Sequence, residues 1–234
     1  MSLDILFEND KIIAINKAPG TLVIPDQYTT VEHTLVGQVS NYLNKKAFVV
    51  HRIDRDTSGI VLFAKDAASH TFLCKQFEAG TVKKKYLTLV LGSVMKDEGQ
   101  IVQPILITAR NITLHPMGKY SVTDYTVLER FKYYSLLEVR PQTGRRHQIR
   151  IHLNSIGHSL AVDTEYSRTK ALFLSDFKKG YKHKGKEKPL IGRLTLHSSS
   201  ITLVEPQKEK EITIESPMPD DFEVALKQLR KYNV

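Results

Sequence analysis

The sequence HRIDRDTSG occupies residues 51–59, between two short apolar segments at 48–50 and 60–63. The apolar segments have the composition of buried strands, so the polar stretch is expected to form a loop held between them. Loops of this kind often carry catalytic groups. Asp54 has arginines on both sides in the sequence, and nearby cations favour the ionised carboxylate that a nucleophile or base needs. A structural ion-pair loop without a catalytic role is the alternative interpretation.

A second polar stretch, RPQTGRRHQIR at 140–150, leads into apolar residues at helical spacing. This spacing predicts a helix over 146–156 that ends at Gly157. Arginines at a helix N-terminus oppose the helix dipole, whereas a bound anion such as phosphate would make the arrangement favourable. Arg150 borders the apolar face of this helix and therefore needs an acidic partner, for which Asp54 is a candidate.

The remaining predicted elements mix hairpins with interspersed helices. One helix is expected over 31–44, with Thr29 and Glu32 as a capping box. A second is expected over 67–78 with Asp66 as its N-cap, and a third begins at Asp221. This order predicts an α+β fold with a mixed, mainly antiparallel central sheet flanked by helices. The expected strands are 3–7, 12–15, 48–50, 60–63, 86–91, 122–128, 135–139, 194–196, 201–204 and 211–214.

The composition narrows the function classes. The 234 residues include 34 Lys and Arg against 25 Asp and Glu, a formal net charge of +9, which favours a polyanionic partner, RNA or DNA before an anionic membrane surface. A single cysteine excludes an internal disulfide and a cysteine zinc cluster. Motifs for phosphate loops, dinucleotide binding and HExxH metal sites are missing, so neither a cofactor nor a metal is predicted. With no visible signal peptide or membrane span, a cytoplasmic protein is expected, and a monomer is the default.

A lysine-rich loop is predicted over 178–188, where six lysines occur with two glycines and no aliphatic residue. A solvated surface loop is one interpretation, and contact with an RNA backbone is the other.

Several motifs together resemble one known family. The sequence HRIDRDTSGI at 51–60 resembles the central signature of the RluA-type pseudouridine synthases, and TGRRHQIRIH at 143–152 resembles their later arginine motif. Three further segments are similar to family motifs in the same order along the chain: INKAPG at 15–20, KYL at 85–87 and RLTLH at 193–197. The resemblance covers about residues 5–201. It departs from many relatives at Ser167, where they have glycine, and in the longer lysine-rich loop.

The resemblance implies the pseudouridine synthase catalytic fold and an RNA pseudouridine synthase activity on structured RNA, ribosomal RNA or tRNA. Asp54 would be the catalytic aspartate, acting as nucleophile or base. Tyr86 would stack on the flipped uracil, and Arg150 would pair with Asp54. Arg52 would fill the space that the base leaves. The other expected RNA contacts are Arg55, Arg145, Arg146, Lys17, Lys178, Lys182 and Lys184.

The resemblance begins almost at the first residue, so a single catalytic domain over residues 1–234 is expected, without the amino-terminal RNA-binding domain of some relatives. A catalytically inactive RNA-binding protein of the same fold is the alternative function. A DNA-binding protein or nuclease is disfavoured because the sequence shows no acidic metal cluster.

Overall fold

The computed structural model describes residues 3–109, 111–182 and 185–233, and the chain divides into two compact units. Unit 1 comprises Met1–Lys85 and Ser198–Pro217, and unit 2 comprises Tyr86–His197 and Met218–Val234. Strands β5 (Lys83–Leu91) and β11 (Leu196–Val204) each run from one unit into the other. The expectation of a single catalytic domain stays a prediction.

Unit 1 is built on antiparallel strands, and each pairing joins neighbours: β1 with β2, β2 with β4, β3 with β4, and β11 with β12. Two α-helices and one 3-10 helix accompany the strands. The bounds of these elements are β1 (Ile5–Glu8), β2 (Ile12–Lys17), η1 (Val31–His33), α1 (Leu35–Leu43), β3 (Phe48–Val49), β4 (Ser58–Ala64), α2 (Ala67–Glu78) and β12 (Glu211–Glu215).

Two hydrophobic clusters cover the two faces of the β2–β4 pair. Successive side chains of a strand point to opposite faces, so alternate residues of β2 enter different clusters. Ile12 and Ala14 pack with Leu73 of α2. Ile13 and Ile15 pack with Leu35 of α1. Both faces of β4, which follows the HRIDRDTSG turn, are therefore buried, and this fixes where the polar stretch ends.

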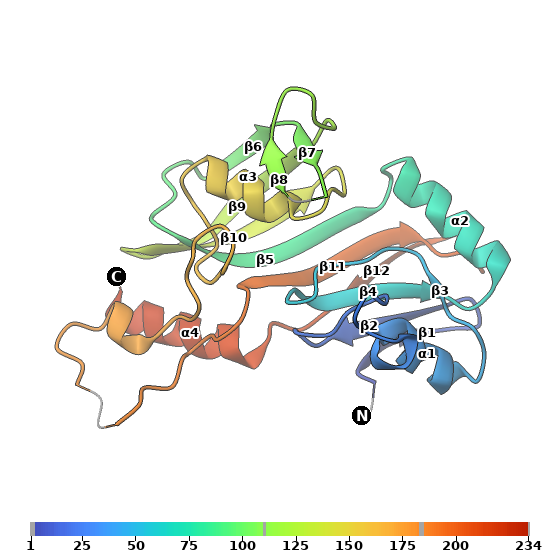
Figure 1. The fold of residues 1–234 in the computed structure, drawn as a ribbon, viewed down its shortest axis with the longest axis horizontal. Coiled ribbons are helices and arrows are strands. Elements are labelled where there is room, and N and C mark those ends of the chain that lie inside the picture. Colours follow the sequence, from blue (N-terminus) through green and yellow to red (C-terminus); the bar gives the residue numbers. More distant parts are fainter. Residues whose placement is uncertain (1–2, 110, 183–184, 234) are drawn as a thin grey trace. The chain divides into compact units, whose positions relative to one another are not determined.

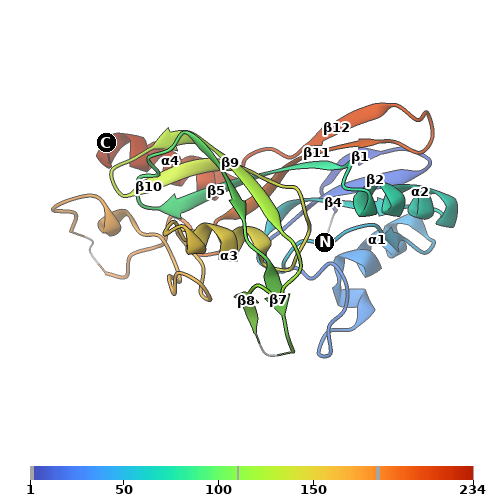
Figure 2. The same ribbon diagram turned by 90° about the horizontal axis from the view of Figure 1, so that it is seen from above.

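Unit 2 contains an antiparallel sheet in the order β5-β10-β9-β6. Helix α3 packs in one hydrophobic cluster with Leu137, whereas α4 packs in another with Leu136, so the two helices cover opposite faces of this sheet (Figure 1). A hairpin of β7 and β8 extends away from the sheet (Figure 2). The bounds are β6 (Glu98–Val102), β7 (Ile105–Ile107), β8 (Ile112–Leu114), β9 (Val122–Arg130), β10 (Tyr134–Pro141), α3 (Gln148–Ser155), η2 (Leu174–Asp176) and α4 (Asp220–Tyr232).

The predicted α+β class with antiparallel pairing is confirmed, and so is the helix over 67–78 capped by Asp66, whose carboxylate accepts from the Ser69 amide at 2.8 Å. In α4, the side chains of Phe222, Ala225, Leu226 and Leu229 are buried as expected. Among residues 3–109, 111–182 and 185–233, no helix has the length and apolarity that a membrane crossing requires.

Three predicted boundaries were wrong. The helix expected over 31–44 is split, because Thr34 has an extended backbone and caps α1 itself, so the Thr29–Glu32 capping box does not form. The helix expected over 146–156 begins only at Gln148, because His147 takes a left-handed conformation with φ of 55°. The two strands expected at 194–196 and 201–204 are replaced by the single strand β11, which begins at Leu196 and ends at Val204.

Candidate active site

The aspartate loop, residues 51–59, runs into β4, whose first two residues are Ser58 and Gly59. Asp54 is half-buried, and its carbonyl oxygen accepts from the Thr57 amide at 3.2 Å, which closes a turn over Arg55 and Asp56. The turn leads directly into Ser58, the first residue of the fully buried β4. The position of Asp54 is thus fixed by a tight turn and by a rigid strand four residues later.

The amino-terminal segment 17–21 is hydrogen-bonded to this loop at Arg55. The Gly20 amide donates to the Arg55 carbonyl at 2.9 Å, and Arg55 Nε donates back to the Gly20 carbonyl at 3.0 Å. Lys17 Nζ also donates to the Arg55 carbonyl, at 2.7 Å. Gly20 adopts a φ of +82°, a conformation that favours glycine. The two motifs, INKAPG and HRIDRDTSG, therefore form one hydrogen-bonded substructure.

Lys17 corrects an expectation, since it was predicted to contact RNA. Its exposed fraction is 1%, and Nζ donates to the carbonyls of Ala18 at 2.9 Å and Thr21 at 2.9 Å besides that of Arg55. An ammonium group has three donors, and three carbonyls take them. Lys17 therefore stabilises the aspartate loop through its hydrogen bond to Arg55, and its buried ammonium group is not available to bind a phosphate.

Gly59 allows close approach of β4 and β11. A Cβ at this position would lie 2.2 Å from the Ser198 carbonyl oxygen, and the φ of Gly59 is +102°. Both the space and the backbone conformation therefore require glycine. The last residue of the HRIDRDTSG sequence is explained by packing of the strand.

His51, the first residue of the loop, is held in place by contacts with β4 and α2. Its Nε2 accepts from the Leu62 amide of β4 at 3.0 Å, and its ring stacks on Phe77 of α2 with centroids 4.9 Å apart. Desolvation, together with the charge of Lys84, lowers the pKa of His51 to about 3. The imidazole is consequently neutral at physiological pH, as an acceptor for a backbone amide must be.

Gln148 organises the arginine segment, residues 143–152, in unit 2. Its Oε1 accepts from Thr143 Oγ1 at 2.7 Å and from the Arg145 amide at 3.0 Å. Its Nε2 donates to the Val122 carbonyl and to Thr123 Oγ1, each at 2.9 Å. All the hydrogen-bonding capacity of this buried amide is used. The turn that carries Arg145 is thereby anchored on β9.

His152 continues this network on the inner face of α3. Its Nδ1 lies 2.9 Å from Thr123 Oγ1, and its Nε2 lies 3.0 Å from the Gln103 carbonyl. Burial lowers the pKa of His152 despite the opposing hydrogen bond to Gln103. Since a carbonyl can only accept, the proton of the neutral ring belongs on Nε2.

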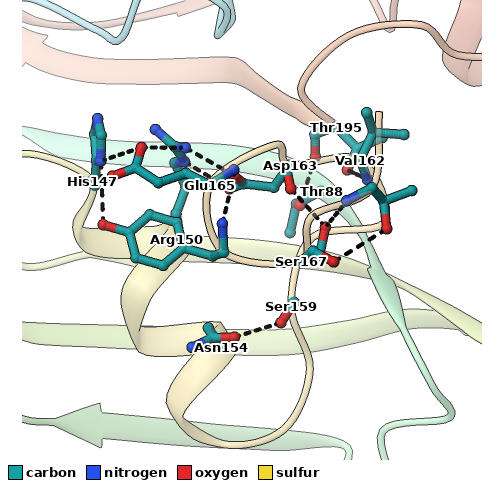
Figure 3. A network of polar contacts seen from close by, with 12 residues as sticks. Thr88, His147, Arg150, Asn154, Ser159, Val162, Asp163, Glu165, Ser167 and Thr195 are labelled. Carbon is teal, nitrogen blue, oxygen red and sulfur yellow. Dashed lines mark hydrogen bonds and ion pairs between the residues drawn. The ribbon is translucent and has the colours of Figure 1, made fainter. Parts of the chain in front are cut away.

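Arg150 is bound by a cluster of acidic and aromatic side chains (Figure 3). Its Nε and Nη2 donate to the two carboxylate oxygens of Asp163 at 2.7 and 2.8 Å, and Nη2 also reaches Glu165 Oε2 at 3.1 Å. The Tyr166 ring centroid lies 5.0 Å from the guanidinium carbon. Burial raises the pKa of Asp163, but its hydrogen bonds to Arg150 and the arginine's charge outweigh burial and lower it overall. The pair is therefore ionised.

The predicted need of Arg150 for an acidic partner is confirmed, and Asp163 supplies one. The pairing with Asp54 stays a prediction, since Asp54 belongs to unit 1 and Arg150 to unit 2. Tyr86 also belongs to unit 2, where it pairs in register with Val139 of β10 and packs against the cluster that contains Ile149. Tyr86 and the arginine helix thus share one hydrophobic core.

The other predicted RNA contacts differ in exposure. Arg52, Arg55, Arg146 and Lys182 are exposed, and Arg145 and Lys178 are half-buried. Lys184 lies outside the described residues. The exposed arginines flank Asp54 in unit 1 and the start of α3 in unit 2, as contacts to a polyanion require.

Asp163, Glu165 and Tyr166 were missed as partners of Arg150. They lie in the segment VDTEY at 162–166, directly after the buried Leu160 and Ala161. An aspartate that follows an apolar run without a break was the available signal, because a buried carboxylate needs a cation.

Comparison with known proteins agrees with these features. A family model described as RNA pseudouridylate synthase matches residues 11–155. Ribosomal large subunit pseudouridine synthase D of Nitrosomonas europaea is 36% identical over 236 residues, covering 97% of this chain and 65% of the relative. Uncharacterized RNA pseudouridine synthase YlyB of Bacillus subtilis is 32% identical, covering 99% and 74%. The chain thus spans about two thirds to three quarters of these relatives.

A solved structure extends the fold comparison. Human RNA Pseudouridylate Synthase Domain Containing 4 superposes with a TM-score of 0.72 at 22% sequence identity, covering 97% of this chain and 92% of that chain. At this identity the likeness concerns the fold.

The matched family model and the fold define the class of protein, the RNA pseudouridylate synthases. The chain belongs to the RNA pseudouridylate synthase family, and within it to the RluA type.

Proposed function

We propose that this enzyme converts uridine to pseudouridine in ribosomal RNA, with Asp54 as the essential carboxylate. The proposal on the substrate rests on relatives whose names specify the large ribosomal subunit. The single observation that carries the proposal on Asp54 is its position. A half-buried carboxylate stands on a turn that is fixed by β4 and by three hydrogen bonds between Arg55 and segment 17–21.

The reaction requires no external reactant. The bond between N1 of uracil and C1′ of ribose breaks, the base turns, and a bond forms between C5 and C1′. The proton on C5 is released, and N1 takes up a proton, so atoms and charges balance. Asp54 would act on the sugar as nucleophile or base. Fixing its carboxylate before the substrate arrives lowers the entropic cost of the step.

The other predicted residues have supporting roles in this proposal. Tyr86 would stack on the uracil after it leaves the RNA helix, and Arg52 would occupy the space that the base vacates. Arg150 would orient Asp54, while Asp163 fixes the guanidinium group of Arg150 through two hydrogen bonds. Arg55, Arg145 and Arg146 would bind phosphates. The enzyme would act as a cytoplasmic monomer.

The test measures tritium release from ribosomal RNA labelled at C5 of uracil, with neither metal nor nucleotide added. Wild type should release tritium and form pseudouridine in equal amounts. RNA binding without release, under conditions in which the protein is folded, would favour the catalytically inactive alternative. Comparing ribosomal RNA with tRNA as substrates tests the choice of RNA.

A further inference from the structure

Three parts of unit 2 lie side by side: the turn between β9 and β10, the carboxyl-terminal end of α4, and the residues directly after η2 (Figure 1). The amides of Lys132 and Tyr133, in the turn between β9 and β10, donate to the carbonyl and side-chain oxygens of Asn233 at 2.8 and 2.9 Å. Lys178 Nζ lies 4.3 Å from the ring centroid of Tyr232. The turn, the helix end and Lys178 are thus joined by direct contacts.

Lysines and tyrosines alternate on this surface. Lys178 Nζ also lies 5.1 Å from the Tyr181 ring, Lys231 Nζ lies 5.2 Å from the Tyr232 ring, and Lys132 Nζ lies 5.4 Å from the Tyr133 ring. We call these six residues the Lys–Tyr surface. Each ammonium group is held over an aromatic face at a distance typical of cation–π contacts. The rings therefore restrict long side chains that would otherwise lose much rotamer entropy on binding a ligand.

The surroundings leave the Lys–Tyr surface positive. Lys179, Lys182 and Lys227 are exposed nearby in sequence. The acidic side chains close to it in sequence, Asp176, Glu187 and Glu129, are fewer than the lysines. Asp176 accepts from the Phe173 amide at 2.7 Å and Glu187 accepts from Ser175 Oγ at 2.6 Å, whereas Glu129 forms an ion pair with Arg230.

We propose that the Lys–Tyr surface is a second RNA-binding surface, which contacts phosphates of the substrate RNA away from the target uridine. This proposal rests on the proposed function for the identity of the RNA. The lysines supply positive charge to phosphate oxygens, and the tyrosine rings hold the ammonium groups in position. None of its residues belongs to the aspartate loop, the arginine segment or Tyr86. An acidic protein is the competing partner; the net charge of +9 and a polyanionic substrate favour RNA.

The first test uses a duplex of about 20 base pairs made only of guanosine and cytidine, so that it carries no target for the reaction. The variant is Lys132→Gln/Lys178→Gln/Lys231→Gln. Loss of three phosphate contacts should reduce the slope of log affinity against log salt by about 2–3, with at least about tenfold weaker binding at low salt. The matched control, Lys45→Gln/Lys75→Gln/Lys208→Gln, removes the same charge from exposed lysines of unit 1 and should bind more tightly than the surface variant. Equal binding by the two triple variants would overturn the proposal.

The second test addresses the rings. Tyr232→Phe retains the aromatic face under Lys178 and should bind the duplex within about twofold of wild type, whereas Tyr232→Leu should bind several-fold more weakly. Melting curves identify variants that are merely unstable. Equal binding by Tyr232→Phe and Tyr232→Leu would contradict the role of the ring. If the variants lost affinity for a polyglutamate peptide but not for the duplex, the partner of this surface would be an acidic protein and not RNA. Because the duplex lacks uridine, these outcomes are independent of whether wild type forms pseudouridine.

Discussion

Arg150 and Asp163 form a buried, bidentate ion pair in which the aspartate side chain has no exposed area and the arginine side chain is 8% exposed. Asp163 Oδ1 also accepts from the amides of Glu165 and Tyr166 at 2.9 and 3.1 Å. The carboxylate is therefore fixed by the backbone, and it fixes the guanidinium group in turn. This arrangement makes Asp163 a positioning residue for Arg150.

Replacing Asp163 tests this relationship. In Asp163→Asn, the guanidinium loses its buried, bidentate partner and retains only the half-exposed Glu165, so the free energy of unfolding should fall by about 3–5 kcal/mol. Single-turnover pseudouridine formation should also slow, since Arg150 is no longer held. Glu165→Gln is the control, because Glu165 is 50% exposed and its ion pair should contribute at most about 1 kcal/mol. Urea titrations that gave equal losses for both variants would contradict a special role for Asp163.

Asp54→Asn retains the size of the side chain but removes the charge. Turnover should become undetectable, whereas folding and RNA binding should remain, because arginines and lysines supply the phosphate contacts. The measurements are single-turnover kinetics, filter binding and a melting curve on the same preparation. Substantial turnover by a verified pure variant would rule out Asp54 as the essential carboxylate.

The predicted contact between Asp54 and Arg150 is tested by a double-mutant cycle. Arg150→Ala should lower stability in any case, because it leaves Asp163 buried without its cation. If Asp54 also contacts Arg150, the double variant Asp54→Asn/Arg150→Ala should be less destabilised than the sum of the single variants. Strictly additive free energies of unfolding would contradict the contact while leaving the role of Asp54 intact.

Tyr86 is tested by separating its ring from its hydroxyl group. Tyr86→Phe should bind RNA nearly as wild type does because the ring face remains, and a drop in turnover would assign proton transfer to the hydroxyl. Tyr86→Ala should lose about 1–3 kcal/mol of binding free energy, the range for stacking of one base. Normal affinity and turnover in Tyr86→Ala would remove Tyr86 from the site.

His51 should make the protein less stable in acid. Its pKa is about 3 in the folded state, below the ordinary value of 6.5, so the unfolded chain binds the additional proton between these values. Stability is complete above pH 6.5 and is lost as the pH falls toward 3, with a loss of about 2 kcal/mol at pH 5. In His51→Gln, an amide oxygen can replace Nε2 as acceptor for Leu62 without titrating. The difference between wild type and variant should shrink from pH 7 to pH 5, and a constant difference would contradict the assignment.

The sequence predicted those parts of the fold that depend on local patterns. Asp66 caps α2 as expected, and the inward face of α4 follows directly from helical spacing. Strands β6, β7 and β8 were not predicted, because they are short and half of their residues face solvent. Helix α3 begins two residues later than expected because His147 has a positive φ. Residue type alone does not indicate this conformation.

For the candidate site, motif resemblance identified Asp54, Tyr86 and Arg150, and residue chemistry predicted that Arg150 needs an acid. The contact with Asp163 spans 13 residues of sequence and depends on how the chain returns after α3, so spacing could not identify it. Lys17 was misjudged for a related reason. Lysine is among the residues least often buried, and only the carbonyls gathered around its ammonium group explain the exception.

The enclosure of Lys17 has a chemical consequence. A reagent that acylates amines must reach the nitrogen atom, and Nζ of Lys17 is buried and enclosed by three carbonyl groups. In the native protein, such a reagent would label surface lysines and leave Lys17 unmodified. Acylation of Lys17 therefore records each separation of the amino-terminal segment from the Arg55 carbonyl. Mass spectrometry of this one amine thus provides an intrinsic probe of the integrity of the loop that carries Asp54.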